Sequence, residues 1–249
     1  MFNFKTNIKM LYKFKTFLKS NKIGRAIYEP IGYIYRKYYK DPQRLRQMKK
    51  YGYESLRFVM EISEKEGWDV MPIFGTLLGF IREGDFIKHD NDIDLAVAPG
   101  HDPKQMAQIL VEKYGLKFGQ ALSYHGQVTE FSVEHHGISI DFFFFEEEGD
   151  KTRVSAYFWN SNEPYTDPHQ NNVQFVYHPK IEAFKYIDIK GISVKVPTNS
   201  EDFLYCEYGK GWNIPDPNYV DNDRPGKVLV KDYGYSHTYE EFINDKIRI

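Results

Sequence analysis

The sequence predicts an α+β domain in which a mixed β-sheet is flanked by helices. Two patterns along the chain and its composition support this prediction. Segments with apolar residues three and four positions apart, typical of amphipathic helices, occur mainly before residue 115; short apolar or alternating segments, typical of strands, dominate the part that follows. The hydrophobic fraction of 41% is sufficient for a core in a chain of 249 residues, which fits one large domain with appendages.

A strongly basic segment precedes this domain. Residues 1–48 contain twelve lysines and arginines and two acidic residues, whereas the rest of the chain contains 21 basic and 33 acidic ones. Apolar residues recur between the lysines at three- and four-residue spacing, which predicts an amphipathic helix. Such a helix suits an anionic membrane surface, or it packs on the domain or on a second subunit. We therefore divide the chain into a basic amphipathic segment, 1–40, and a main domain, 41–249.

Composition also bears on the compartment. No apolar run reaches the roughly 18–20 residues that a transmembrane helix needs, and the N-terminus lacks the pattern of a signal peptide. The single cysteine, Cys206, excludes an internal disulfide framework and a cysteine-based zinc cluster. We expect a cytoplasmic protein that lies peripherally on the inner face of the cell membrane.

The first half of the main domain is expected to contain three helices and two strands. Asp41 and Pro42 suit the N-cap and first position of a long helix, and Gly67 suits its end. The other expected elements, in order, are a strand over 70–74, a short helix over 77–82, a strand over 93–97, and a helix that Asp102-Pro103 begins and Gly115 ends.

The second half is expected to consist mainly of strands. Thr198 and Glu201 have the spacing of a capping box, which predicts a short helix that stops at Gly209. No regular structure is assigned beyond Pro215, where the chain is polar and aromatic. The expected strands cover 129–134, 138–145, 153–159, 173–177, 181–187 and 192–196.

Three acidic residues alternate where the strand over 93–97 begins. Because a strand sends every second residue to the same face, Asp90, Asp92 and Asp94 are expected on one face, with Ile93 and Leu95 directed into the core. Carboxylates gathered on one face repel one another unless a cation lies among them. The alternation therefore predicts a divalent-metal site.

A third ligand is expected from a neighbouring strand. Asp141 lies inside an otherwise apolar strand, where burial of an unpaired carboxylate is costly. Either a metal or a salt bridge at the strand end would remove that cost. Magnesium prefers oxygen ligands and is typically held by one or two carboxylates plus substrate phosphates, so Asp92, Asp94 and Asp141 are the candidate ligands for Mg²⁺ or Mn²⁺.

The turn before the acidic strand is a candidate phosphate site. Gly75 and Thr76 offer backbone N–H groups at the start of a helix, where phosphate binds well. Arg82, about one and a half turns further along, has a guanidinium fork that suits a phosphate oxygen. The alternative for Arg82 is an ion pair with Glu83 or Asp85.

These motifs together resemble the nucleotidyltransferase superfamily with the polymerase-β-like fold and, more narrowly, the LicD/fukutin-related phosphotransferase family. The resemblance extends over residues 55–216 and rests on Gly-Thr-Leu-Leu-Gly at 75–79, Arg82, Gly84, Phe86-Ile87, Asp-Asn-Asp-Ile-Asp at 90–94, Val196-Pro197, Tyr-Gly-Lys-Gly-Trp at 208–212, and Pro215. The chain departs from the family pattern at Lys88-His89, where Pro-Trp is usual, and at Asn91, where Asp is frequent.

The resemblance implies metal-dependent transfer of a phosphorylated alcohol from a CDP-activated donor to a hydroxyl of a cell-surface or lipid-linked glycan, with release of CMP. The alcohol favoured is phosphocholine, with ribitol or glycerol phosphate as alternatives, and no nucleic-acid partner is implied. Asp92, Asp94 and Asp141 are then the catalytic residues, and Gly75, Thr76 and Arg82 bind the donor phosphates. Lys88, His89, Asp90 and Trp212 are candidate donor or substrate contacts.

Two other functions remain open on the sequence. One is true nucleotidyl transfer, in which the nucleotide stays on the acceptor, and the other is a non-catalytic role as a membrane-associated partner in glycan assembly. The aromatic residues Trp159, Tyr165 and Trp212 could form a cage for a quaternary ammonium group, which would favour choline.

Overall fold

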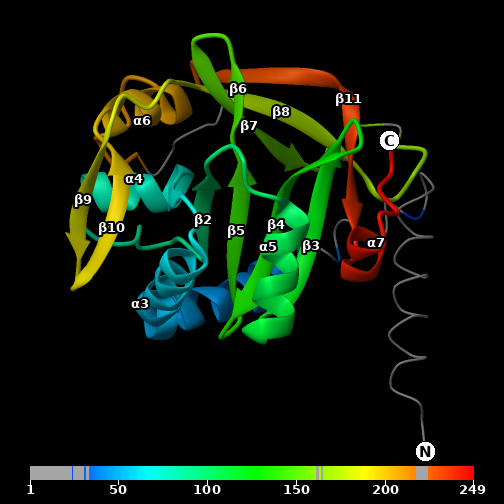
Figure 1. Ribbon diagram of the computed structural model, residues 1–249, viewed down its shortest axis with the longest axis horizontal. Coiled ribbons are helices and arrows are strands. Elements are labelled where there is room, and N and C mark those ends of the chain that lie inside the picture. Colours follow the sequence, from blue (N-terminus) through cyan, green and yellow to red (C-terminus); the bar gives the residue numbers. More distant parts are fainter. Residues whose placement is uncertain (1–23, 25–30, 32–33, 161–162, 164, 217–223) are drawn as a thin grey trace, which may run out of the picture.

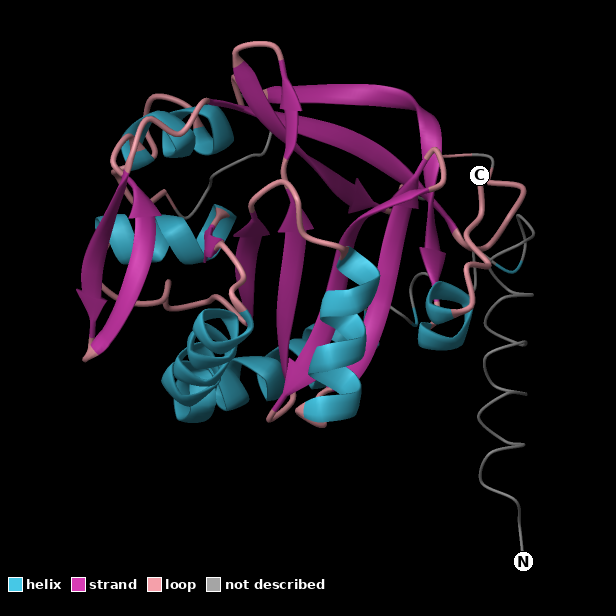
Figure 2. Cartoon of the chain, in the orientation of Figure 1, coloured by secondary structure: helices cyan, strands magenta, loops and turns pink. Residues whose placement is uncertain are grey.

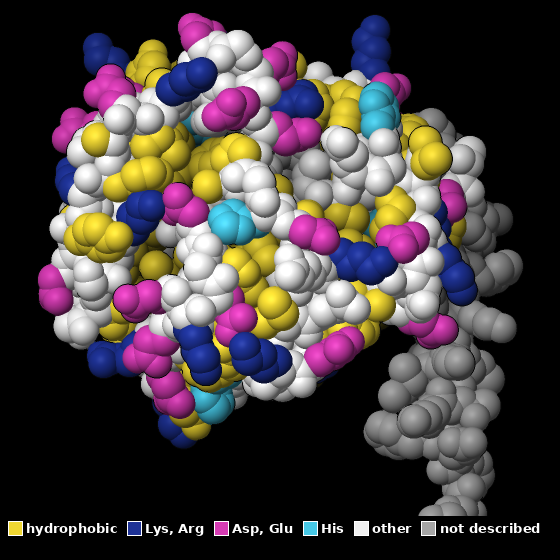
Figure 3. Space-filling model, viewed as in Figure 1, with side chains coloured by type: hydrophobic (Ala, Val, Ile, Leu, Met, Phe, Trp, Pro, Cys, Tyr) yellow, Lys and Arg dark blue, Asp and Glu magenta, His cyan; other side chains and the backbone are white. Residues whose placement is uncertain are grey.

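The computed structural model describes residues 24, 31, 34–160, 163, 165–216 and 224–249. The predicted amphipathic helix of the basic segment therefore lies almost wholly outside the described residues. Within the described part of the chain, no helix is both long enough and apolar enough to span a membrane. On the face seen in Figure 3, acidic and basic side chains are interspersed.

A nine-stranded sheet forms the centre of the molecule, with the strand order β1-β2-β5-β4-β3-β11-β8-β7-β6 (Figure 1). Among the described strands, β2 and β5 are the one parallel pair, so the predicted mixed sheet is confirmed. The strands are β1 Val70–Pro72, β2 Asp92–Val97, β3 Lys117–Tyr124, β4 Gln127–His135, β5 Ile138–Phe144, β6 Glu146–Glu148, β7 Lys151–Phe158, β8 Gln170–Pro179, and β11 Lys227–His237; β9 Phe184–Ile189 and β10 Ile192–Pro197 form a separate hairpin.

Helices flank the sheet, as the sequence predicts (Figure 2). α3 packs on β2 and β5, α5 packs on β4, α4 lies beside β2, and α6 packs on β8. Because β7 also contacts β4 and β5, the far half of the sheet curls back over the strands that carry the predicted acids. The helices are α3 Asp41–Glu66, α4 Phe74–Arg82, α5 Pro103–Gln108, α6 Ser200–Tyr208 and α7 Tyr239–Ile243, with π-helical turns at Arg36–Lys40 and Ile109–Lys113.

The core confirms the alternation predicted for the acidic strand. Ile93, Leu95 and Val97 are completely buried in β2. The four phenylalanines at 142–145 are also buried, as expected for core residues. The polar side chains of β2 are thus confined to the opposite face, and the strand begins at Asp92 rather than at Ile93.

Two predicted helix caps are wrong, although both helices exist. α3 ends at Gly67 with a φ of 72°, as predicted, but a π-helical turn leads into it and no side-chain cap bond is present, so Asp41 lies inside the helix. α6 begins after Asn199, and the hydroxyl of Thr198 donates to the carbonyl of Ala183 at 3.1 Å instead of capping the helix. A capping box does occur in α7, where Thr238 and Glu241 bond reciprocally.

The C-terminal part of the chain holds regular structure that the sequence did not indicate. β11 lies between β3 and β8 and joins the two halves of the sheet, with a register shift between Leu229 and Tyr233 in its pairing with β8. β3 was also not predicted. The polar composition of β11 and the irregular pairing of both strands hide the alternation that marks a strand.

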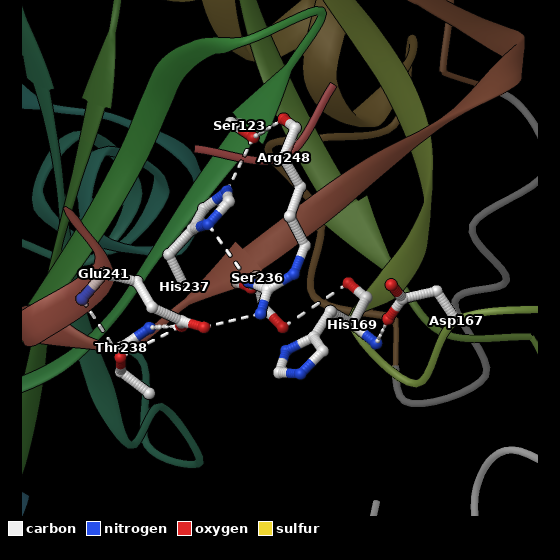
Figure 4. A network of polar contacts seen from close by, with 8 residues as sticks. All are labelled: Ser123, Asp167, His169, Ser236, His237, Thr238, Glu241 and Arg248. Carbon is white, nitrogen blue, oxygen red and sulfur yellow. Dashed lines mark hydrogen bonds and ion pairs between the residues drawn. The ribbon is translucent and has the colours of Figure 1, made fainter. Parts of the chain in front are cut away.

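A network of polar contacts fixes the chain end to this sheet (Figure 4). The guanidinium of Arg248 donates to Glu241 at 2.5 Å, to the carbonyl of Ser236 at 3.1 Å, and to Nδ1 of His237 at 3.3 Å. Nε2 of His237 lies 2.7 Å from the hydroxyl of Ser123. An imidazole that accepts at Nδ1 and donates at Nε2 is neutral, and burial followed by the charge of Arg248 lowers the pKa of His237 to about 4.

Candidate active site

The parallel pairing of β2 with β5 brings the predicted carboxylates together. Asp94 lies directly opposite Asp141, and Asp92 lies opposite Ser139. Side chains at paired positions point to the same face of a sheet, and alternation places Asp92 and Asp94 on that face together. The three predicted metal ligands therefore share one face, and all three are half-buried.

A fourth carboxyl group lies on the same face, and the sequence analysis missed it. Glu130 in β4 pairs with Phe143 of β5, two residues beyond Asp141, and only 9% of its surface is exposed. One signal was available, because Glu130 is an acid inside a strand that was predicted to precede the strand of Asp141. Its place on the carboxylate face depends on which strands are neighbours and on their register, and the sequence pattern of a single strand shows neither.

Asp90 approaches the group from the loop before β2. Its carboxyl oxygen Oδ2 is buried and has no hydrogen-bond partner among the residues that the structure describes. Burial and the neighbouring Asp92 raise the pKa of Asp90 to about 7. Asp90 is thus close to the other acids, although it precedes the strand instead of forming part of it.

Crowding and burial have the same electrostatic effect on the other acids. Burial, and then the charge of Asp92, raises the pKa of Asp141 to about 7. Burial followed by the charges of Asp92 and Asp141 raises the pKa of Asp94 well above its ordinary value, and burial beside Asp141 does the same for Glu130. These carboxylates are therefore costly to ionise together, which is the condition that a bound cation relieves.

Two basic residues at and just before the start of α3 act on the acids, and a third, Arg224, lines a cavity beside them. Arg44 and Lys40 both act to lower the pKa of Asp141, and Arg44 also acts on Asp92, against the larger effect of burial. Arg44 makes no ion pair within 4.0 Å among the residues that the structure describes. The sequence analysis did not connect this helix with the site.

Gly75 and Thr76 lie in the first turn of α4, which packs beside the acidic strand β2. The buried hydroxyl of Thr76 accepts a hydrogen bond from the backbone N–H of Asp94 at 2.9 Å. A Cβ on Gly75 would lie 2.9 Å from Oδ2 of Asp90, so only glycine leaves room for that carboxyl group. Phe74 has a φ of 51°, a left-handed conformation that is rare for a bulky residue and is typical of functional turns.

Arg82 and Trp212 lie together, away from this turn. Arg82 is at the last position of α4, where its guanidinium pairs with Glu83 at 2.7 Å and donates to the carbonyl of Trp212 at 3.2 Å. The structure thus shows the ion pair that was the alternative for Arg82. Its phosphate role and the substrate role of Trp212 stay predictions.

Lys88 and His89 occupy the exposed tip of a turn beside the site. The N–H of Asp90 donates to the carbonyl of Ile87 at 2.9 Å, which closes the turn around these two residues. Both side chains are exposed, and Asp90 links the turn directly to the carboxylate face. This position is compatible with a contact between these side chains and a bound donor, and that contact stays a prediction.

A cavity of about 350 Å³ opens beside the carboxylate face. Its aromatic walls come from four residues that the sequence analysis did not connect: Phe74, Phe143, Tyr157 and Tyr208. The three residues of the predicted choline cage do not line this cavity, although two of them, Trp159 and Tyr165, stack on each other with 5.9 Å between the ring centroids. The full lining is Phe74, Gly75, Asp90, Asp94, Glu130, Phe143, Ala156, Tyr157, Tyr208 and Arg224.

The carboxylate oxygens of this face are suitable ligands for a hard divalent cation, although they do not form a complete coordination shell. Within the described residues, no group of three or more His, Cys, Asp or Glu side chains is arranged to hold a metal ion. The face nevertheless offers carboxylate oxygens next to an open cavity, and one of them is buried without a partner in the described part of the chain. That arrangement suits an ion held by one or two carboxylates together with oxygens of a ligand.

Comparison with known proteins identifies relatives of this site. The family model described as LicD/FKTN/FKRP, nucleotidyltransferase domain, matches residues 67–199, which include Asp92, Asp94, Glu130 and Asp141. The chain is 29% identical over 153 residues to the mouse ribitol-5-phosphate transferase FKTN, and 27% identical over 201 residues to the human ribitol 5-phosphate transferase FKRP. These matches cover 57% and 79% of this chain, but only 28% and 38% of the two relatives.

Proposed function

The chain belongs to the LicD/FKTN/FKRP family, and from this membership we propose that it transfers a phosphorylated alcohol from a CDP-activated donor to a hydroxyl of a glycan, releasing CMP. The names of both relatives favour a polyol phosphate of the ribitol type over phosphocholine as the group transferred. CDP-glycerol and CDP-choline remain alternative donors.

One observation carries the proposal. The β2–β5 register places Asp94 opposite Asp141 and keeps Asp92 on the same face, beside a cavity and a helix start. Acids so arranged raise one another's pKa and destabilise the fold unless a ligand uses them. A set of carboxylates that is costly when empty supports a metal- and phosphate-binding site.

The proposed chemistry assigns a role to each part of the face. Asp92 and Asp94 would hold Mg²⁺ or Mn²⁺, which when bound offsets the negative charge of the donor phosphates. Asp141, which pairs with Asp94 across the two strands, would complete the metal site or accept the proton of the attacking hydroxyl. The N-terminal backbone of α4 at Gly75 and Thr76, together with Arg44, would orient the phosphates.

The test is a CMP-release assay with purified protein. CDP-ribitol, CDP-glycerol and CDP-choline are each incubated with Mg²⁺ and a glycan acceptor, and Asp92→Asn and Asp94→Asn are expected to lose the release that wild type shows. Asp150→Asn, which makes the same change at an exposed position in the β6–β7 turn, serves as the matched control. Normal turnover in both site variants would refute the metal assignment, and a nucleotide found on the acceptor would indicate nucleotidyl transfer instead.

We also propose that the basic segment attaches the protein to an anionic membrane surface. The proposal rests on its excess of lysines and arginines and on its apolar spacing. Removal of residues 1–40 is expected to abolish co-sedimentation with vesicles that contain phosphatidylserine. Unchanged co-sedimentation would contradict a membrane role for this segment.

A further inference from the structure

Arg224 lines the cavity beside the carboxylate face, and the proposed chemistry gives it no role. It lies beyond residue 199, where the match to the family model ends, in a part of the chain for which the sequence predicted no regular structure. Among the described residues of the lining it is the one basic side chain, beside three acids: Asp90, Asp94 and Glu130. A positive charge inside an acidic cavity bears on which ligand that cavity receives.

Backbone hydrogen bonds hold the turn that carries Arg224. The N–H of Gly226 donates to the carbonyl of Cys206 in α6 at 2.9 Å, and the N–H of Tyr177 in β8 donates to the carbonyl of Gly226 at 2.8 Å. A Cβ on Gly226 would lie 2.3 Å from the carbonyl oxygen of Tyr177, so only glycine allows this close approach. The turn is thus attached to α6 and to β8, two residues away from Arg224.

The guanidinium lies over an aromatic wall of the cavity. Its Cζ atom is 5.5 Å from the ring centroid of Tyr208, the last residue of α6, which lines the cavity too. Burial, followed by the charges of Glu207 and Asp94, raises the pKa of Tyr208 well above its ordinary value. The charge of Arg224 acts on the same phenol in the opposite direction. Charges of both signs therefore act within one cavity.

The lining offers contacts for a cation and for an anion. The carboxylates of Asp90, Asp94 and Glu130 suit a divalent cation. A guanidinium presents its N–H groups in a planar fork that matches phosphate oxygens, and Gly75 adds the positive end of the α4 dipole to the same cavity. The acids would repel a phosphate alone, and Arg224 would repel a cation alone. A phosphate that carries its own divalent cation satisfies both parts of the lining.

We propose that Arg224 is a donor-binding residue whose guanidinium hydrogen-bonds the phosphates of a metal-bound nucleoside diphosphate in this cavity. This inference rests on the proposed function, because it takes the cavity beside Asp94 as the place of the donor phosphates. It gives a segment outside the family-model match a direct part in binding the substrate.

The experiment measures two ligands of opposite charge on the same variants. Arg224→Met keeps an unbranched side chain and removes the charge, whereas Arg224→Lys keeps the charge and removes the fork. Calorimetry on the full chain measures binding of Mg²⁺ alone, and of CDP at saturating Mg²⁺. Arg57→Met, which makes the same change at an exposed position of α3, is the matched control.

Arg224→Met is expected to weaken binding of CDP by about 10- to 100-fold, because a charge-assisted hydrogen bond to phosphate is lost. Arg224→Lys should fall between this variant and wild type, and Arg57→Met should bind CDP within about twofold of wild type. Binding of Mg²⁺ alone should be unchanged or tighter in Arg224→Met, because a positive charge leaves the cavity. A residue that only shapes the cavity would affect both ligands in the same direction.

Thermal unfolding checks that the variants are folded. If Arg224→Met does not fold, Arg224→Lys decides the question. A loss of CDP affinity of at least about threefold at unchanged Mg²⁺ affinity then supports the phosphate contact, and an unchanged CDP affinity refutes it.

Several results would overturn the inference. It is wrong if Arg224→Met binds CDP within about twofold of wild type, if it loses Mg²⁺ to the same extent as CDP, if Arg224→Lys binds CDP no better than Arg224→Met, or if wild type binds no CDP. It stands, and the proposed function fails alone, if CDP binding depends on Arg224 but no CDP-activated alcohol releases CMP. The converse result, CMP release by Arg224→Met equal to that of wild type, leaves the proposed function and removes this role.

Discussion

The carboxylate face and the C-terminal network treat charge in opposite ways. Asp94 lies among four other acids, Asp90, Asp92, Glu130 and Asp141. None of the five forms an ion pair with a residue that the structure describes, and burial raises the pKa of each. In the C-terminal network, the carboxylate of Glu241, the imidazole of His237 and the carbonyl of Ser236 all accept hydrogen bonds from the guanidinium of Arg248. There, burial alone would raise the pKa of Glu241, but hydrogen bonds from Arg248 and Thr238 lower it to about 2.

This difference distinguishes a ligand-binding site from a network of contacts that stabilises the fold. Paired charges contribute to folding because their interactions are complete in the folded chain. Crowded like charges oppose folding until a ligand arrives, so their energy becomes available for binding. Substitutions in the two regions should therefore affect activity and stability in opposite proportions.

The largest effect is expected for Asp94→Asn. Transfer should fall by at least about 10³-fold, roughly 4 kcal/mol of transition-state stabilisation, because a ligand of the proposed metal is lost. The melting temperature in EDTA should stay unchanged or rise, since one of several repelling acids becomes neutral. Added Mg²⁺ should raise the melting temperature of wild type and not that of the variant. A variant that is strongly destabilised in EDTA would show that Asp94 stabilises the fold.

Arg248→Met should have the reverse signature. The change leaves Glu241 and the carbonyl of Ser236 without their charged donor, which is expected to lower the free energy of unfolding by about 1–3 kcal/mol. Activity per folded molecule should not change. Urea denaturation measures the loss, with Lys246→Met, an exposed neighbour, as the control. A loss of activity at unchanged stability would show that the C-terminal network takes part in the reaction instead of stabilising the fold.

Gly234→Ala tests a residue that touches both regions. A Cβ there would lie 2.3 Å from Cε1 of Tyr157, which lines the cavity, and 2.7 Å from the carbonyl of Ser123, whose hydroxyl contacts His237. Because the carbonyl is backbone, the chain must shift, at about 1–2 kcal/mol in unfolding free energy. Donor affinity should fall as well. Calorimetry measures donor binding and thermal unfolding measures stability for the same variant. Unchanged donor binding would show that the cavity does not depend on the C-terminal network.

The smallest effect is expected when single titrating groups are removed, because each removal changes only the slope of stability against pH. His237 has a folded pKa of about 4 against an ordinary 6.5, so its contribution is complete above pH 6.5 and is lost as the pH falls through 4. Asp141 has a folded pKa of about 7 against 3.8, so its contribution is complete below 3.8 and is lost as the pH rises through 7.

Each slope is at most about 1.4 kcal/mol per pH unit. Several acids of the carboxylate face share the raised pKa of Asp141, so in EDTA the stability of wild type should fall as the pH rises from 4 to 7. Asp141→Asn should make this fall shallower, and His237→Gln should make it steeper. Parallel pH profiles for the two variants would show that the regions do not differ as described.

What the sequence predicted correctly was set by local patterns. The alternation around Ile93 and Leu95 is a property of one strand, and it was enough to place Asp92 and Asp94 on one face. Asp141 was found because an acid stands out within an apolar strand. The alternation was extended one step too far at Asp90, where the closed turn at Ile87 delays the start of the strand.

What the sequence missed depends on contacts between distant segments. Glu130 acquires its meaning from the register of β4 on β5, and Tyr157 from the curl that returns β7 to those strands. Arg44 reaches the acids only because α3 packs on β2 and β5. β11 is stabilised by pairing with β3 and β8, whereas its own polar composition does not predict a strand.

The pairing of Asp94 with Asp141 also determines which changes of chain length the site can tolerate. Loss of one residue early in β5, before Asp141, would leave the strand able to pair with β2 but would exchange the faces of Asp141 and Phe142. The acid would then enter the core and a phenyl ring would face the cavity. An insertion in the β6–β7 turn leaves the pairing of β2 with β5 unchanged. Insertions should therefore be far better tolerated in that turn than anywhere between Asp92 and Asp141 where they shift the register.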